Sequence, residues 1–111
     1  MISVLVVVPT YNESESIRSL LTRLDMARKS ISQKFDIDIL LVDDDSPDKT
    51  ADIAKSMNLS GFSILNRKVK SGLGPAYLAG FKQGLIGNYQ YFVEMDADLS
   101  HQPEQLVDLL D

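Results

Sequence analysis

Apolar stretches of strand length alternate with amphipathic stretches along this chain. Four mostly apolar runs cover positions 2–9, 35–42, 61–65 and 89–95. Between the first two runs, apolar residues recur at the i, i+3, i+4 and i+7 spacing of a helix face, and a shorter copy follows the second run. These residues are Ile17, Leu20, Leu21 and Leu24, then Ile53, Ala54 and Met57. The pattern predicts strands and helices in alternation.

Polar residues and proline suggest where the helices begin. Ser14 fits the start of the first helix, while Ser46 and Asp48 fit caps for a helix that begins near Lys49. The pair Pro103-Glu104 fits the first turn of a last helix that reaches the end of the chain.

The first, second and fourth apolar runs are nearly continuous, as expected when helices cover both faces of a parallel sheet. With right-handed crossovers, the simplest arrangement is a three-layer α/β/α fold. Its sheet is doubly wound, Rossmann-like and mostly parallel, with strand order 3-2-1-4. The order of the strands reverses between the first and the fourth. We therefore expect the loops after the first, second and fourth strands to share one crevice.

Acidic side chains close two of these runs. Asp43, Asp44 and Asp45 end the second, and Asp96 and Asp98 follow the fourth. Two carboxylates about 4 Å apart repel by roughly 4 kcal/mol at an effective dielectric of 20, so a positive group is expected between them. Mg²⁺ or Mn²⁺ bound by Asp96 and Asp98 would bridge to a substrate diphosphate. The alternative is an ordinary turn before the last helix.

The loops after the first and second strands carry candidate nucleotide contacts. Asp43 and Asp44 are candidates to accept hydrogen bonds from a base amide or a ribose hydroxyl. Pro9 is expected to end the first strand because it has no amide hydrogen. Tyr11 then offers a face for stacking, beside Glu13. Alternatively, Tyr11 covers the sheet edge and Glu13 lies in a first helical turn, where negative charge is favoured.

A basic, glycine-containing loop follows the third strand. Arg67, Lys68 and Lys70 precede the segment Ser71-Gly72-Leu73-Gly74. Glycines before a helix allow backbone amides to approach a phosphate, so Lys70 and Gly72 are candidate diphosphate contacts. The alternative is a solvated loop, with Gly80 and Gly84 selected for close packing. We interpret His101, the sole histidine, as a loop residue rather than a metal ligand.

The composition limits the class of protein. The length of 111 residues and a hydrophobic content of 44% fit one domain, residues 1–111. The absence of cysteine excludes disulfides and thiolate metal sites. The net charge of −5 and the short basic segment disfavour nucleic acid as a partner. No run approaches the roughly 20 apolar residues of a membrane span, so we expect a soluble, cytoplasmic protein.

Four segments in one order carry a family resemblance: VVVPTYNE, LLVDDDSPDKT, NRKVKSGLGPAYLAGF and MDADLSHQPEQL. Together they resemble the family-2 inverting glycosyltransferases of GT-A fold, and among these the dolichol-phosphate (polyprenyl-phosphate) mannosyltransferases. The resemblance implies that Pro9, Tyr11, Glu13 and an aspartate of VDDDS hold the nucleoside. It also implies that Asp96 and Asp98 form the D-x-D motif for metal and diphosphate. Ser100 stands where some members carry a metal-coordinating glutamine.

The resemblance implies a reaction and its partners. A sugar would pass from a nucleotide-sugar donor, with GDP-mannose the nearest suggestion, to a polyprenyl or dolichyl phosphate at the cytosolic face of a membrane. Family domains are about twice as long as this chain, within the ordinary domain range. The chain therefore resembles the N-terminal half, and no catalytic base is assigned. We expect donor and metal binding with little or no turnover, and self-association or a completing partner at the exposed edge of the fourth strand.

Three other classes remain open from the residues alone. A phosphoacceptor receiver domain has similar length and acidic strand ends, but it needs an acidic pair after the first strand. A D-x-D phosphatase carries its motif after the first strand, whereas Asp96 follows the fourth here. The third class is a non-catalytic nucleotide-binding remnant, or a subunit that a separately encoded partner completes.

Overall fold

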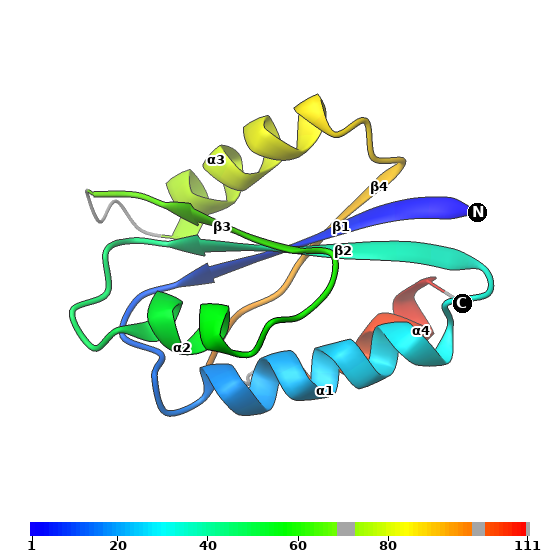
Figure 1. Ribbon diagram of the computed structural model, residues 1–111. Coiled ribbons are helices and arrows are strands. Elements are labelled where there is room, and N and C mark those ends of the chain that lie inside the picture. Colours follow the sequence, from blue (N-terminus) through cyan, green and yellow to red (C-terminus); the bar gives the residue numbers. More distant parts are fainter. Residues whose placement is uncertain (69–72, 99–101, 111) are drawn as a thin grey trace.

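The computed structural model describes residues 1–68, 73–98 and 102–110, and its strands and helices alternate as the sequence predicts (Figure 1). The strands are β1 (Ile2–Thr10), β2 (Phe35–Asp43), β3 (Phe62–Asn66) and β4 (Tyr91–Glu94). The helices are α1 (Ile17–Ser30), α2 (Thr50–Ser56), α3 (Leu73–Ile86) and α4 (Gln105–Leu110). Among these helices, none is long and apolar enough to cross a membrane.

The four strands form one parallel sheet in the order β3-β2-β1-β4, which confirms the predicted doubly wound arrangement. Helix α3 covers one face of the sheet, and α1, α2 and α4 cover the other (Figure 1). The order in which successive strands are added to the sheet reverses between β1 and β4. In this class of fold, ligands bind beyond the carboxyl ends of the strands at that position.

The middle of β1, from Val4 to Val8, is apolar because both faces of the strand are buried there. Val4, Val6 and Val8 pack into the core beneath α1, whereas Leu5 and Val7 pack into the smaller core beneath α3. Alternate residues of a strand point to opposite faces, so a strand covered on both sides needs apolar residues at every position. This double burial produces the continuous apolar run seen in the sequence.

Two glycines bring α3 close to the sheet. A Cβ atom on Gly80 would lie 2.4 Å from Val7 Cγ1, and one on Gly84 would lie 2.5 Å from Phe92 Cε1. Real side chains do not tolerate such separations. Gly80 and Gly84 therefore allow the close packing that the sequence suggested for them, and this leaves the role of the preceding loop untested.

Two predicted boundaries and one predicted cap differ from the structure. Helix α1 begins at Ile17, not at Ser14. Helix α2 begins at Thr50, next to Lys49 as predicted, but the Ser46 hydroxyl contacts Asp43 instead of capping the helix. Pro9 does not end β1, which continues to Thr10.

Pro9 is tolerated inside β1 because no strand needs its missing donor. The Val7 carbonyl accepts from Met95 N–H, so the backbone of Val7 faces β4. Pro9, two residues later, faces the same side, where β4 has already ended at Glu94. The carbonyl of Thr10 then bonds Asp44 N–H on the opposite side.

Candidate functional site

The loops after β1 and β2 are joined by consecutive backbone amides. Asn12 N–H donates to Ser46 Oγ, Glu13 N–H to Thr50 Oγ1 and Ser14 N–H to Asp48 Oδ2, each at 3.0 Å. Backbone N–H groups beyond the end of a strand have no partner in the sheet and need other acceptors. The polar segment after β2 supplies these acceptors. These contacts hold the predicted nucleoside loop in place.

Asp48 has the structural role that the sequence predicted, through different partners. It accepts a bond from Thr50 N–H at 3.1 Å as well as from Ser14 N–H. Burial raises the pKa of Asp48, but the hydrogen bonds from Thr50 and Ser14 outweigh burial and lower that pKa below its usual value of 3.8. Asp48 is therefore an ionised bridge between two loops.

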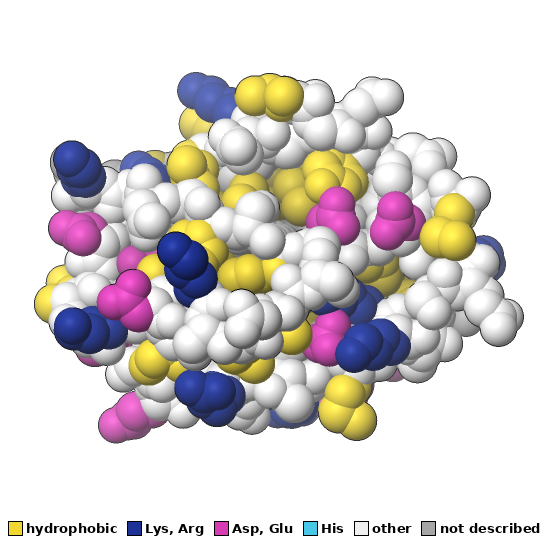
Figure 2. Space-filling model, in the orientation of Figure 1, with side chains coloured by type: hydrophobic (Ala, Val, Ile, Leu, Met, Phe, Trp, Pro, Cys, Tyr) yellow, Lys and Arg dark blue, Asp and Glu magenta, His cyan; other side chains and the backbone are white. Residues whose placement is uncertain are grey.

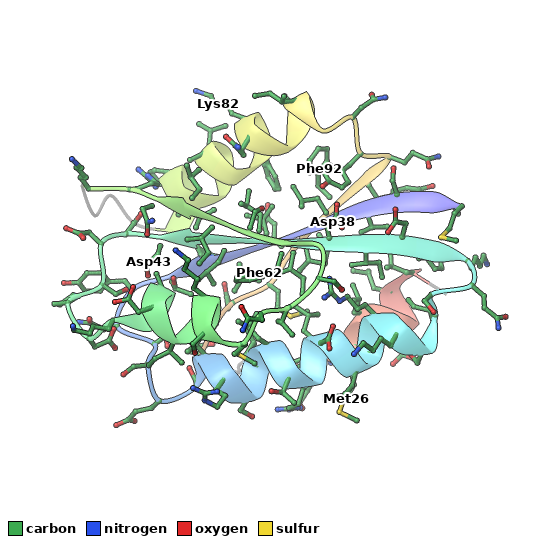
Figure 3. The ribbon with its side chains drawn as sticks, in the orientation of Figure 1. Met26, Asp38, Asp43, Phe62, Lys82 and Phe92 are labelled. Atoms are coloured by element: carbon green, nitrogen blue, oxygen red, sulfur yellow. The ribbon has the colours of Figure 1, made fainter. Side chains whose placement is uncertain are left out.

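Asp43 is buried at the end of β2 and is held by three donors (Figure 3). Its Oδ1 accepts from Thr10 Oγ1 at 2.7 Å and Ser46 Oγ at 2.6 Å, and its Oδ2 accepts from Ser46 N–H at 3.0 Å. Sequence reasoning did not identify Thr10 or Ser46 as partners. Their positions, at the last residue of β1 and three residues after the end of β2, are the signal that would have found them.

Asp44 differs from Asp43 because one of its buried oxygens is poorly satisfied. The residue is 5% exposed, and within the described part of the chain its Oδ1 accepts no hydrogen bond. Arg67 Nη1 lies 3.5 Å away and forms an ionic contact. A buried carboxylate oxygen is costly to leave without a donor. The site can therefore take one from a ligand N–H or O–H.

The acids after β1 and β4 lie close enough to affect one another. Burial raises the pKa of Glu13, a hydrogen bond from Ser16 opposes that effect, and the negative charges of Asp98, Asp48 and Asp96 raise it further. Met95 and Ala97 are buried, whereas Asp96 is half-buried and Asp98 is exposed. The loop after β4 thus presents its acids beside Glu13, as the strand order predicts.

These acids fit a hard divalent cation that also binds phosphate oxygens. No group of three metal-binding side chains is arranged in advance among the described residues. Mg²⁺ in nucleotide sites is typically bound by one or two carboxylates together with water and substrate phosphates, so a group of three is not required. Burial is the largest cause of the raised pKa of Glu13, and the charges of Asp98, Asp48 and Asp96 add to it; a bound cation would offset that added repulsion.

The remaining predicted contacts are only partly described. Lys70, Gly72 and His101 lie outside the described residues. Arg67 and Lys68 lie within the described residues. The strand arrows of Figure 1 point toward one end of the molecule, and Figure 2 shows acidic and basic side chains side by side at that end. Tyr11 is half-buried beside the joined loops. The roles of Pro9, Tyr11, Lys70 and Gly72 in nucleotide binding remain predictions.

Comparison with known proteins identifies the family. Residues 5–111 match the family described as Glycosyl transferase family 2. The chain belongs to glycosyltransferase family 2. This assignment agrees with the observed strand order, which differs from the 2-1-3-4-5 order of receiver domains. The receiver and phosphatase alternatives are therefore set aside.

Several family relatives carry names of related activities. The chain is 49% identical over 110 residues to an undecaprenyl-phosphate mannosyltransferase of Micrococcus luteus, covering 97% of this chain and 43% of the relative. It is 44% identical to a polyprenol monophosphomannose synthase of Mycolicibacterium smegmatis, covering 96% and 39%. A dolichol-phosphate mannosyltransferase of Pyrococcus furiosus is 36% identical, with 96% and 28% covered. The chain spans less than half the length of each.

Proposed function

We propose that this chain forms the part of a glycosyltransferase that binds the nucleotide-sugar donor and a divalent metal. The acceptor of the complete enzyme is a polyprenyl or dolichyl phosphate, which the names of the relatives support. The observation that carries the proposal is the contact between two loops of a family 2 domain: Ser16 touches Glu13 and donates to the carbonyl of Ala97, which lies between Asp96 and Asp98. Mannose is the sugar that these names favour, and guanosine diphosphate is the carrier that the family resemblance suggests.

The nucleoside lies on the β1–β2 side of the site. Asp44 Oδ1, buried and without a donor among the described residues, accepts a hydrogen bond from the base or ribose. Tyr11 stacks on the nucleoside, and Pro9 and Glu13 complete its pocket. Asp43 holds the joined loops in register beneath it.

The diphosphate lies on the β4 side. Asp96 and Asp98 would hold Mg²⁺ or Mn²⁺, and Lys70 and the amide of Gly72 would contact the phosphates. A bound metal would supply positive charge that stabilises the leaving diphosphate. An acceptor phosphate oxygen bonds the anomeric carbon from the opposite face while the bond to the diphosphate breaks, and the electron pair leaves with the diphosphate.

The 111-residue chain on its own binds the donor but transfers little or no sugar, because its relatives are more than twice as long. The complete enzyme acts at the cytosolic face of a membrane, where a lipid phosphate is accessible. The edge of β4 offers a surface for a second copy or a completing partner. Sugar transfer by the purified chain would contradict the proposal that this chain binds the donor without turning it over.

The decisive experiment is calorimetric titration with guanosine diphosphate and uridine diphosphate, each with and without Mn²⁺. We expect metal-dependent binding that is weakened about 10-fold or more in Asp96→Ala and Asp98→Ala, in line with losses at metal-ligand shells. Asp36→Ala serves as the control, because Asp36 is exposed near the opposite ends of the strands. Equal binding by the wild type, Asp96→Ala and Asp98→Ala would show that these acids do not hold the metal.

A further inference from the structure

Ser16 occupies the N-cap position of α1 but does not cap the helix. Its side chain makes no hydrogen bond to the amides of α1. A serine at this position ordinarily accepts a bond from an amide in the first turn. The Ser16 hydroxyl instead donates to the Ala97 carbonyl at 2.8 Å, across 81 positions of sequence. Its contacts to the Glu13 carbonyl and to Glu13 Oε2 are longer, at 3.4 Å.

Ala97 is the middle residue of the Asp96-Ala97-Asp98 segment, and it is held from two directions. Its methyl group is buried in the core that includes Ile17 and Leu20 of α1. Its carbonyl accepts the Ser16 hydroxyl. Because both neighbours of Ala97 carry the acids, fixing its peptide fixes where the side chains of Asp96 and Asp98 leave the backbone.

We propose that Ser16 is a positioning residue for the metal-binding loop after β4. This inference rests on the proposed function, because it assumes that Asp96 and Asp98 bind metal and diphosphate. Mg²⁺ demands nearly ideal geometry, and groups that orient metal ligands typically change metal affinity by 10- to 100-fold. Ser16 also touches Glu13, so one hydroxyl links the loops after β1 and β4.

The test compares Ser16→Ala with two matched variants. Ser16→Thr keeps a hydroxyl at the position. Ser30→Ala removes another α1 hydroxyl that donates to a carbonyl, that of Ala27 at 2.6 Å, at the distant end of the helix. Each variant is first checked for an unchanged thermal unfolding midpoint. Guanosine and uridine diphosphates are then titrated with and without Mn²⁺.

We expect Ser16→Ala to lose about 10-fold in affinity with Mn²⁺ and little without it. Ser16→Thr should recover most of this loss, and Ser30→Ala should match the wild type. Hydrogen exchange of the amides at 97 and 98 in the metal-free chain should be faster in Ser16→Ala alone.

The outcomes separate this inference from the proposed function. Failure of the wild type to bind either nucleotide with Mn²⁺ would overturn the proposed function. Metal-dependent binding by the wild type that is unchanged in Ser16→Ala would overturn the role of Ser16 alone. An equal loss with and without Mn²⁺ would also overturn it, because that result indicates a general structural role.

Discussion

Asp43 and Asp44 are neighbours in sequence but have different surroundings. Asp43 is surrounded by three protein donors, whereas Asp44 Oδ1 has only the ionic contact with Arg67 among the interactions described for it. A ligand hydrogen bond to Asp43 would compete with bonds that hold two loops together. A ligand hydrogen bond to Asp44 would satisfy a buried charge, which is the energetically favoured choice.

Asp25 provides a side chain whose ionisation contributes to stability away from the site. It is mostly buried and accepts bonds from Arg28 Nε at 2.9 Å and from Lys29 at 2.9 Å. Burial raises the pKa of Asp25, but the bonds from Lys29 and Arg28 outweigh burial and lower that pKa below 3.8. The folded state therefore holds the Asp25 proton less tightly than the unfolded state.

The stabilisation from Asp25 is consequently present above about pH 3.8 and is lost as the pH falls through the lower pKa of the folded state. We expect Asp25→Asn to be less stable than the wild type at neutral pH, with the difference shrinking below pH 3.8. Urea unfolding of both proteins at several pH values measures this difference. A difference that stays constant down to pH 3 would contradict the ionic contribution.

Strands and helices could be predicted from the sequence where burial alone requires apolar residues. The apolar residues of β1 and β2 and the spacing from Ile17 to Leu24 predicted the elements, and right-handed connections then predicted the sheet order. The start of α1 and the capping role given to Ser46 were predicted less well, because the backbone amide of Ser14 bonds Asp48 and Ser46 contacts Asp43. Such partners come from other loops, and local spacing does not indicate them.

The contact between α3 and the sheet gives a prediction about two glycines of one helix. Alanine would gain up to about 1 kcal/mol in helix propensity at either site, while overpacking costs about 1–3 kcal/mol. At Gly80 the clash is with Val7, a stiff β-branched residue of the central strand, and with Val42 at 3.2 Å. At Gly84 the clash is with the ends of Phe92 and Leu5, which have more freedom to move.

We therefore expect Gly80→Ala to lower the free energy of unfolding more than Gly84→Ala does. Urea unfolding midpoints of the two variants test this order. Gln83→Ala, at an exposed position of the same helix, should change stability by less than about 0.5 kcal/mol. The reverse order, or a stabilised Gly80→Ala, would show that α3 shifts easily over the sheet.

The molecule as a whole explains why the site was only partly predictable. The strand order alone places the loops after β1, β2 and β4 together, so the acidic cluster followed from topology. The role of each acid depends on hydrogen bonds such as those from Thr10 to Asp43 and from Ser16 to Ala97. These bonds join residues 33 and 81 positions apart, and a single sequence does not pair them.

The exposed edge of the sheet leads to a prediction about association. In the described residues β4 pairs only with β1. Grooves of about 460 and 400 Å³ lie beside it, each lined by residues of β4 and α4. Tyr91 and Leu109 are 54% and 68% exposed along this edge. Unpaired strand edges with apolar side chains promote pairing between chains, and lysine at such positions prevents it.

We expect the 111-residue chain to self-associate as its concentration rises in sedimentation velocity, and Tyr91→Lys and Leu109→Lys to remain monomeric. Met26→Lys is the matched control, because Met26 is 67% exposed on α1 and should leave association unchanged. If all three variants associate like the wild type, the contact lies elsewhere. If only Met26→Lys blocks association, the surface of α1 and not the β4 edge forms the contact, and the sheet edge is protected despite its exposed side chains.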